Sequence, residues 1–138
     1  MPEPAASPFT YLILRLVPSV ERGERINVGV VVFCRQRGFL GARVALDPGR
    51  LGAIAPGLSA EHVAELADHL AALVRVAEGA ADAGPIAALP QSERFGWLAA
   101  PSSTVIQASE VHTGLCVTPD ETLDALFDRL VAAAPGSV

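Results

Sequence analysis

The chain contains no lysine, and each of its ten basic residues is an arginine. It also has few aromatic residues, with a single tryptophan and a single tyrosine. No G-x-S-x-G, H-E-x-x-H, Walker-type or G-x-G-x-x-G motif occurs, so the familiar signatures of serine hydrolases, zinc proteases, phosphate-binding loops and dinucleotide-binding folds are missing. These absences favour a protein without catalytic activity and leave an enzyme as the alternative.

Hydrophobic segments long enough to span a membrane are missing as well. The best apolar run near the N-terminus, residues 11–17, is interrupted by Arg15, and no basic segment precedes it. This pattern predicts neither a signal peptide nor a transmembrane helix, so we expect a cytoplasmic protein. The two cysteines, Cys34 and Cys116, lack C-x-x-C spacing and stand in apolar runs. Buried, reduced thiols are therefore expected in preference to a disulfide or a metal pair.

The composition provides enough apolar material for one compact domain. Of the 138 residues, 51% are hydrophobic and 18% are charged. A chain of this size buries about two thirds of its unfolded surface, so its core requires no cofactor, metal or disulfide for stability. We predict a single domain over residues 9–134, a flexible lead at residues 1–8 and a tail at residues 135–138.

Alternating hydrophobic patterns predict three strands in the first third of the chain. Residues 9–17 alternate with a period of two, and residues 26–34 form a second strand that is almost wholly apolar. Alternate residues of the second strand are expected to share one face: Ile26, Val28, Val30 and Val32. Gly38 is placed for a hairpin turn into a third strand at residues 39–46. The three strands predict an antiparallel meander.

Two amphipathic helices are predicted in the remainder. Residues 59–79 carry apolar side chains at helical spacing, and Ser59 is a suitable N-cap. A capping box of Thr118 and Glu121, with Pro119 at the first helical position, begins a C-terminal helix.

The segment between these helices reads as further strands. Residues 104–109 are β-branched, residues 110–114 are expected to form a hairpin loop, and residues 115–117 are expected to return beside the first of them. The predicted fold is α+β: an antiparallel meander sheet of four to five strands with helices packed on one face.

Charge is distributed unevenly along the chain. Residues 15–50 contain seven arginines and three acids, a balance of +4, whereas residues 51–138 contain three arginines and eleven acids, a balance of −8. The long first connection places charged and polar groups beside a rigid scaffold, where binding residues often lie. The candidates there are Arg15, Arg22, Glu24, Arg25 and Asn27. The alternative is structural, with salt bridges from Arg15 or Arg25 to Glu24 inside the fold and with Asn27 satisfying the backbone of the turn.

Two other groupings are interpreted as structural. His62, Glu65 and His69 would resemble a zinc site, but seven residues of helix separate the two histidines by roughly 10 Å, too far for two ligands of one ion. His112 could activate Cys116 as a nucleophile, yet nothing in the sequence orients the pair. We predict no metal site and no catalytic residue.

A wider set of residues resembles a known family. The segment Arg22–Val30 follows a strand that carries Tyr11 and Arg15, and later come Arg94-Phe95-Gly96-Trp97, Ser102-Ser103, Gln107, His112, Gly114 and a capped helix. Over roughly residues 8–132 this arrangement resembles the bacterial domain of unknown function 3037. The resemblance implies a small bacterial cytoplasmic protein without assigned activity, often encoded beside HipA-like kinases, and it supplies no catalytic residues. Arg94, Gln107 and His112 join the candidate binding residues.

Three functional hypotheses follow. The first is a non-catalytic interaction or accessory module that binds an acidic surface of a partner such as a HipA-like kinase. The second is an enzyme acting on a phosphorylated or nucleotide substrate, with Arg15, Arg25 and Arg94 as anion clamps and His112 or Glu24 as the base. The third, nucleic-acid binding, is disfavoured by the acidic net charge of −5 and the missing lysines. The sequence leaves the oligomeric state open.

Overall fold

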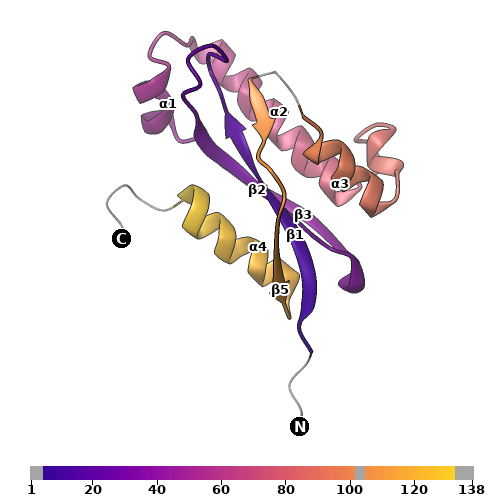
Figure 1. Ribbon diagram of the computed structural model, residues 1–138. Coiled ribbons are helices and arrows are strands. Elements are labelled where there is room, and N and C mark those ends of the chain that lie inside the picture. Colours follow the sequence, from indigo (N-terminus) through magenta and orange to yellow (C-terminus); the bar gives the residue numbers. More distant parts are fainter. Residues whose placement is uncertain (1–4, 102–104, 133–138) are drawn as a thin grey trace.

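The computed structural model describes residues 5–101 and 105–132. Five strands form one antiparallel sheet: β1 (Ser7–Leu16), β2 (Ile26–Cys34), β3 (Phe39–Val44), β4 (Ile106–Ala108) and β5 (His112–Cys116). Strand β2 pairs with one side of β1 and β3 lies beyond it, whereas β4 and β5 pair with the two halves of the other side of β1 (Figure 1). The predicted single α+β domain with an antiparallel sheet is confirmed. The predicted tail, residues 135–138, and the first four residues of the predicted lead lie outside the described residues.

Four α-helices and three short helical turns complete the domain. They are α1 (Pro48–Ile54), η1 (Arg35–Arg37), α2 (Ala60–Glu78), η2 (Ile86–Ala88), α3 (Gln91–Ala99), α4 (Pro119–Phe127) and η3 (Asp128–Ala132). Helix α2 begins as predicted, because the Ser59 hydroxyl accepts a hydrogen bond from the backbone N–H of His62. It ends at Gly79, whose φ of 71° is a conformation that glycine adopts without strain. No helix in the described part of the chain is long and apolar enough to cross a bilayer.

Helix α4 begins where the sequence predicts, but not by the predicted capping box. The side chain of Thr118 makes no capping hydrogen bond. Its backbone carbonyl instead accepts hydrogen bonds from the backbone N–H and the hydroxyl of Thr122, while Pro119 occupies the first turn. Proline and the acidic residues of the first turn therefore account for this helix start without a side-chain cap.

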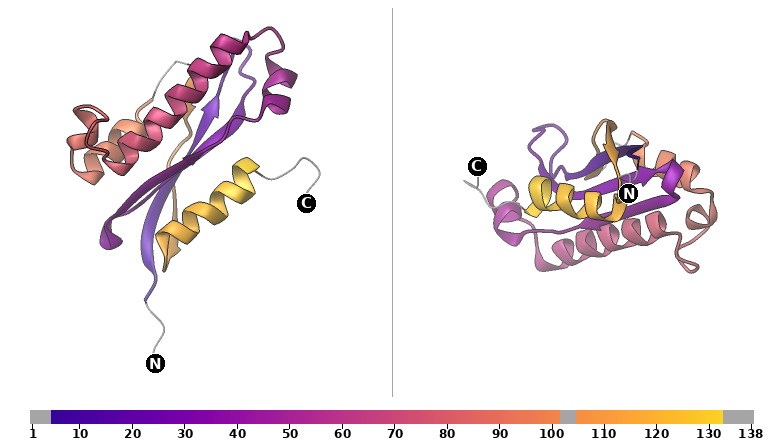
Figure 2. Two further views of the ribbon diagram at one scale, coloured as in Figure 1. Left: turned by 180° about the vertical axis from the view of Figure 1, so that it is seen from behind. Right: turned by 90° about the horizontal axis from the view of Figure 1, so that it is seen from below.

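The helices cover both faces of the sheet, whereas the sequence predicted helices on one face. Helices α2 and α3 lie on one side and α4 lies on the other, as the edge-on view of Figure 2 shows. One core cluster joins the first face to α2 and α3 and includes Leu12, Leu14, Leu16, Leu70 and Phe95. The second joins the other face to α4 and includes Phe9, Val30, Val32, Leu123 and Phe127. A strand buried on both faces is expected to be almost wholly apolar, as β2 is.

A β-bulge in β2 changes the face of the sheet on which some β2 side chains lie. Leu14 pairs with Gly29 and Arg15 pairs with Asn27, so Val28 is an extra residue on β2. Val28 packs in the α2 cluster while Val30 and Val32 pack in the α4 cluster, so the predicted common face of these three valines is wrong. A β-bulge of this kind interrupts the alternation of side chains and increases the local twist of the strand.

Strands β4 and β5 form one interrupted edge and not the predicted hairpin. Both run antiparallel to β1, and neither pairs with the other in the described part of the chain. Leu14 pairs with Ala108 and Tyr11 pairs with His112, so the register moves by one residue between the two strands. The predicted loop at residues 110–114 is therefore split, because its first two residues form the irregularity and the rest belong to β5.

Candidate functional site

Three of the predicted binding residues lie side by side on adjacent strands. Arg15 of β1 pairs with Asn27 of β2 and with Gln107 of β4. Side chains alternate along a strand, and Leu14 and Leu16 point toward α2, so Arg15 lies on the α4 side of the sheet. The backbone register thus sets Asn27, Arg15 and Gln107 in one row, the polar row.

The guanidinium of Arg15 has capacity for another partner. Its Nε atom is buried and lacks a hydrogen-bond partner among the described residues. Arg25, which is exposed just before β2, likewise has no carboxylate within ion-pair distance in the described part of the chain. A buried donor without an acceptor is costly.

Glu110 and His112 lie close to the polar row. A backbone hydrogen bond lowers the pKa of the Glu110 carboxyl, and the charges of Arg15, His112 and Arg25 lower it further, although desolvation opposes these effects. His112 Nε2 is 3.5 Å from Glu110 Oε1, and the His112 ring lies 5.1 Å from the ring of Tyr11. Cations and one exposed carboxylate are therefore gathered where β1 meets the break between β4 and β5.

Ser109 holds this break in place. The backbone N–H of Ile13 donates to the Ser109 hydroxyl oxygen at 2.8 Å, and the Ile13 carbonyl accepts from the Ser109 N–H at 2.8 Å. The Ser109 hydroxyl in turn donates to the Glu110 carbonyl at 2.8 Å. A side-chain oxygen thus replaces a backbone acceptor in the ladder, and this substitution permits the irregularity that positions Glu110.

We expect Ser109→Ala to destabilise the domain by about 1–3 kcal/mol, because the buried N–H of Ile13 would lose its acceptor. Urea unfolding monitored by circular dichroism measures this change. Ser109→Thr keeps the hydroxyl and is the control, for which we expect a smaller loss. An equal loss in both variants would mean that packing around Ser109, and not the hydrogen bond, accounts for its role.

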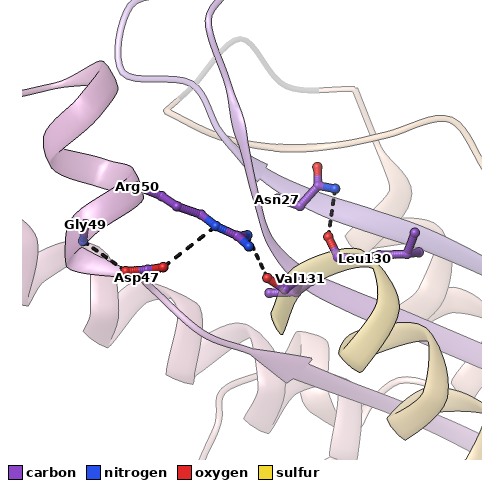
Figure 3. A network of polar contacts seen from close by, with 6 residues as sticks. All are labelled: Asn27, Asp47, Gly49, Arg50, Leu130 and Val131. Carbon is purple, nitrogen blue, oxygen red and sulfur yellow. Dashed lines mark hydrogen bonds and ion pairs between the residues drawn. The ribbon is translucent and has the colours of Figure 1, made fainter. Parts of the chain in front are cut away.

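Asn27 is already engaged by the terminal helical turn. Its Nδ2 donates to the carbonyl of Leu130 at 3.0 Å, and Arg50 donates to the neighbouring carbonyl of Val131 at 2.7 Å (Figure 3). Arg50 is oriented by Asp47, whose carboxylate lies 3.7 Å away. These bonds satisfy carbonyls at the end of η3 and attach it to β2 and α1. Asn27 thus satisfies a carbonyl of η3, whereas the structural alternative assigned it to the backbone of the turn before β2.

The other predicted binding residues do not join the polar row. Arg22 and Glu24 form an exposed ion pair with each other at 2.5 Å in the first connection. Arg94 lies on the α2 side of the sheet, where its guanidinium donates to the carbonyls of Leu89 at 2.6 Å and Ala77 at 3.3 Å. Arg94 therefore fastens α3 to the end of α2, and the three-arginine clamp of the enzyme hypothesis does not form.

The aromatic residues beside Arg94 divide between the core and the surface. Phe95 is buried and stacks on Phe33 with ring centroids 5.4 Å apart, whereas Trp97 is 45% exposed. Trp97 lines a hollow between α2, α3 and β4 that also contains Leu73 and Ala108. One aromatic ring of this segment thus belongs to the core and the other lies at the surface.

Two residues that lie at the site, Glu110 and Tyr11, were not among the binding residues predicted from the sequence. Glu110 was assigned to a loop, and Tyr11 was noted only as part of the family resemblance. A β-bulge leaves little signal in the sequence, although a buried serine followed by a charged residue within a β-branched segment is compatible with one. No group of three or more His, Cys, Asp or Glu within the described residues is arranged to hold a metal ion.

The two cysteines are both buried, and their sulfur atoms are 3.9 Å apart. Burial raises the pKa of the Cys116 thiol, with a further contribution from its hydrogen bond to Cys34. Cys34 and Cys116 belong to strands on opposite sides of β1, so their backbones are about 10 Å apart at ordinary strand spacing, farther than a disulfide spans. The structure thus contains two free thiols.

One family model matches residues 11–131 of the 138 and is described as "Protein of unknown function (DUF3037)". No curated protein and no solved structure matches the chain significantly. The match includes the polar row, Arg25, Glu110 and His112, and it agrees with the resemblance carried by the Arg22–Val30 segment. The chain therefore belongs to the DUF3037 family.

Proposed function

We propose that this protein is a non-catalytic interaction module that binds an acidic surface of another protein through Arg15 and Arg25. The observation that carries the proposal is that both guanidinium groups lack a carboxylate partner within ion-pair distance in the described residues, while Arg22, Arg43, Arg50 and Arg75 each have one. Arginine binds carboxylates with two parallel hydrogen bonds, so an acidic side chain is a suitable ligand.

The position of Arg15 supports a specific contact and not only general attraction. Arg15 is partly buried between two paired neighbours, so its direction is fixed by the sheet. Interactions of a desolvated charge are stronger than those of a charge in bulk water. Arg25 is exposed and would add attraction at the rim. The family resemblance makes a HipA-like kinase encoded nearby the first partner to test.

The alternatives receive less support. The enzyme hypothesis placed Arg94 with Arg15 and Arg25 as anion clamps, but Arg94 lies across the sheet. Of its two candidate bases, Glu24 is paired with Arg22, whereas His112 lies beside Glu110 near the polar row. For nucleic-acid binding, the remaining arginines would need to form a basic track. Arg43 is paired with Asp124 at 2.9 Å and Arg75 is paired with Asp82, so these positive charges are locally neutralised.

We expect Arg25→Ala to weaken binding to the purified neighbouring kinase about 10-fold, equivalent to about 1.4 kcal/mol, and to reduce the salt dependence of association. Biolayer interferometry at several salt concentrations measures both effects. Arg22→Ala is the matched control, because it removes an equal charge three residues away from an arginine that is already paired with Glu24.

Arg15→Gln, which keeps a polar side chain, tests the buried member of the pair. A larger loss of binding than for Arg25→Ala is expected, with unchanged circular dichroism. Binding that is insensitive to both substitutions, or that falls equally with Arg22→Ala, would contradict the proposed site.

A further inference from the structure

β5 and the residues that flank it carry an unusual concentration of exposed apolar side chains. Among the described residues, six large hydrophobic side chains are exposed: Val20, Trp97, Val105, Val111, Leu115 and Val117. Three of the six fall within the seven residues 111–117, and Leu115 is 72% exposed, the highest value of the set. Scattered apolar residues are normal on a surface, but a cluster of them on one strand edge marks an interaction site.

This edge also lacks the protection that edge strands usually have. In the described residues β5 pairs only with β1, so its other side presents free backbone N–H and C=O groups. Residues 111–117 contain no Lys, Arg, Asp, Glu or Pro, and His112 is turned toward Tyr11. Natural proteins protect open edges with such residues or cover them, so an open, uncharged, apolar edge is a template for another strand.

We propose that β5 pairs antiparallel with β5 of a second copy of this chain, so that the two sheets join in a symmetric dimer. A two-fold axis at Gly114 is the arrangement that matches the side chains of the edge. Gly114 has no side chain to obstruct the axis, and the ring of Phe9 already occupies the space that a Cβ would take there. The occupant is a second copy because the edge is complementary to itself.

The register around Gly114 carries this self-complementarity. Antiparallel pairing about that residue sets Val111 opposite Val117 of the second copy, and Thr113 opposite Leu115 of the second copy. Residues directly opposite in an antiparallel pair share a face of the sheet and touch. Each of the exposed apolar residues 111, 115 and 117 therefore meets an apolar residue or a threonine, and the symmetry repeats each contact.

A hollow next to Thr113 provides room for the incoming leucine. The hollow has a volume of about 360 Å³ and is lined by Pro8, Phe9, Thr10, Phe33, Arg35, Gln36 and Thr113. Leu115 of the second copy lies opposite Thr113 in the proposed register, on the side of the sheet away from α4. Insertion of its side chain toward this hollow would bury the most exposed large hydrophobic residue of the set.

The charges near the edge are compatible with the same register. Glu110 falls opposite Thr118 of the second copy, and Thr118 lines a hollow together with Arg37. No like charges of the edge are set opposite one another in this register. The absence of opposed like charges favours the register centred on Gly114 over registers that are shifted along the strand.

The mass of the protein in solution tests the proposal. Light scattering across a dilution series is expected to give twice the chain mass of 14.3 kDa for the wild-type protein at the high end. Leu115→Lys is expected to give the monomer mass throughout, because lysine places two like charges at the axis. Val20→Lys alters a residue that is 55% exposed away from the edge and is expected to remain dimeric. Circular dichroism confirms that both variants are folded.

Cross-linking tests the register itself. In the proposed dimer, position 111 of one copy adjoins position 117 of the other, whereas the two positions 111 lie about 20 Å apart along the strands. A mixture of Val111→Cys and Val117→Cys proteins is therefore expected to cross-link with a short bis-maleimide, and each variant alone is not. The native thiols are buried and serve as the background measured in the wild-type protein.

A monomeric wild-type protein at every concentration would overturn the proposal. So would a dimer that survives Leu115→Lys, or one that lacks the mixed cross-link, since either result means that the edge is free or is used by something else. The dimer is independent of the proposed partner site, so Arg25→Ala is expected to leave it intact. Failure of the dimer and failure of acidic-partner binding are thus distinguishable.

Discussion

Leu12→Ala is expected to destabilise the domain by about 3 kcal/mol, within the 2–5 kcal/mol that such core truncations cost. Leu12 is fully buried and pairs with Val31 in the central part of the sheet. It belongs to the cluster that joins β1 to α2 and α3, so its removal leaves a cavity that neither the sheet nor the helices can fill without moving. Urea unfolding, with the slope of the transition compared between variants, measures the loss.

Val20→Ala is the control for this prediction. Val20 is 55% exposed in the first connection, so the same kind of truncation is expected to change stability by no more than about 0.5 kcal/mol. A small effect of Leu12→Ala alongside this control would contradict the position of Leu12 at the junction of sheet and helices.

Gly29→Ala is expected to cost about 1–3 kcal/mol, the range for a side chain forced into a filled site. A Cβ at this position would lie 2.9 Å from Val44 Cγ1, 3.0 Å from the Arg43 carbonyl oxygen and 3.1 Å from Leu14 Cδ1. Two of these atoms belong to side chains, but the third is backbone in the neighbouring strand and cannot retreat without weakening the β2–β3 ladder. Thermal unfolding should show a clear decrease in melting temperature.

Gly52→Ala is expected to have the opposite sign. Gly52 lies inside α1, and a Cβ there would meet nothing within 4 Å. Replacing glycine by alanine in a helix stabilises it by about 0.5–1 kcal/mol. Equal effects at the two glycines would mean that the close approach of β2, β3 and β1 at Gly29 is not rigid.

Periodicity predicted most of the elements well. The strands near residues 9–17, 26–34 and 39–46 and the helix at residues 59–79 all appear within a few residues of their predicted bounds. These segments carry long, regular patterns whose period depends only on local geometry. The short strands β4 and β5 were predicted near their positions, but they were predicted to pair with each other as a hairpin. Both pair with β1, which is distant in the sequence, and local patterns do not reveal such a partner.

The layer arrangement escaped prediction for a related reason. Sequence patterns show that β2 is apolar on both faces, but they do not say which helix covers which face. The β-bulge at Val28 makes the assignment of faces harder still. Val28 belongs to an alternating series with Val30 and Val32, but it packs toward α2 while they pack toward α4. An almost wholly apolar antiparallel strand was the available signal that both faces are buried.

The candidate site was predictable in part. Arg15, Asn27 and Gln107 were named from three separate segments, and the register brings them together. Glu24 was named from the charged first connection and Arg94 from the family resemblance, and neither source indicates the partner that each residue finds within the fold. The difference between paired and unpaired arginines, on which the proposed function depends, appears only when the carboxylates of the described residues are placed.

The central position of β1 also affects how the protein is made. β1 is synthesised before its partners on one side, because the Ser109 hydroxyl that bonds Ile13 lies 96 residues later in the chain. One side of β1 can pair with β2 early, but the other must wait until β4 and β5 have been synthesised. Closure of so long a loop is slow, and the nascent sheet exposes an open edge meanwhile.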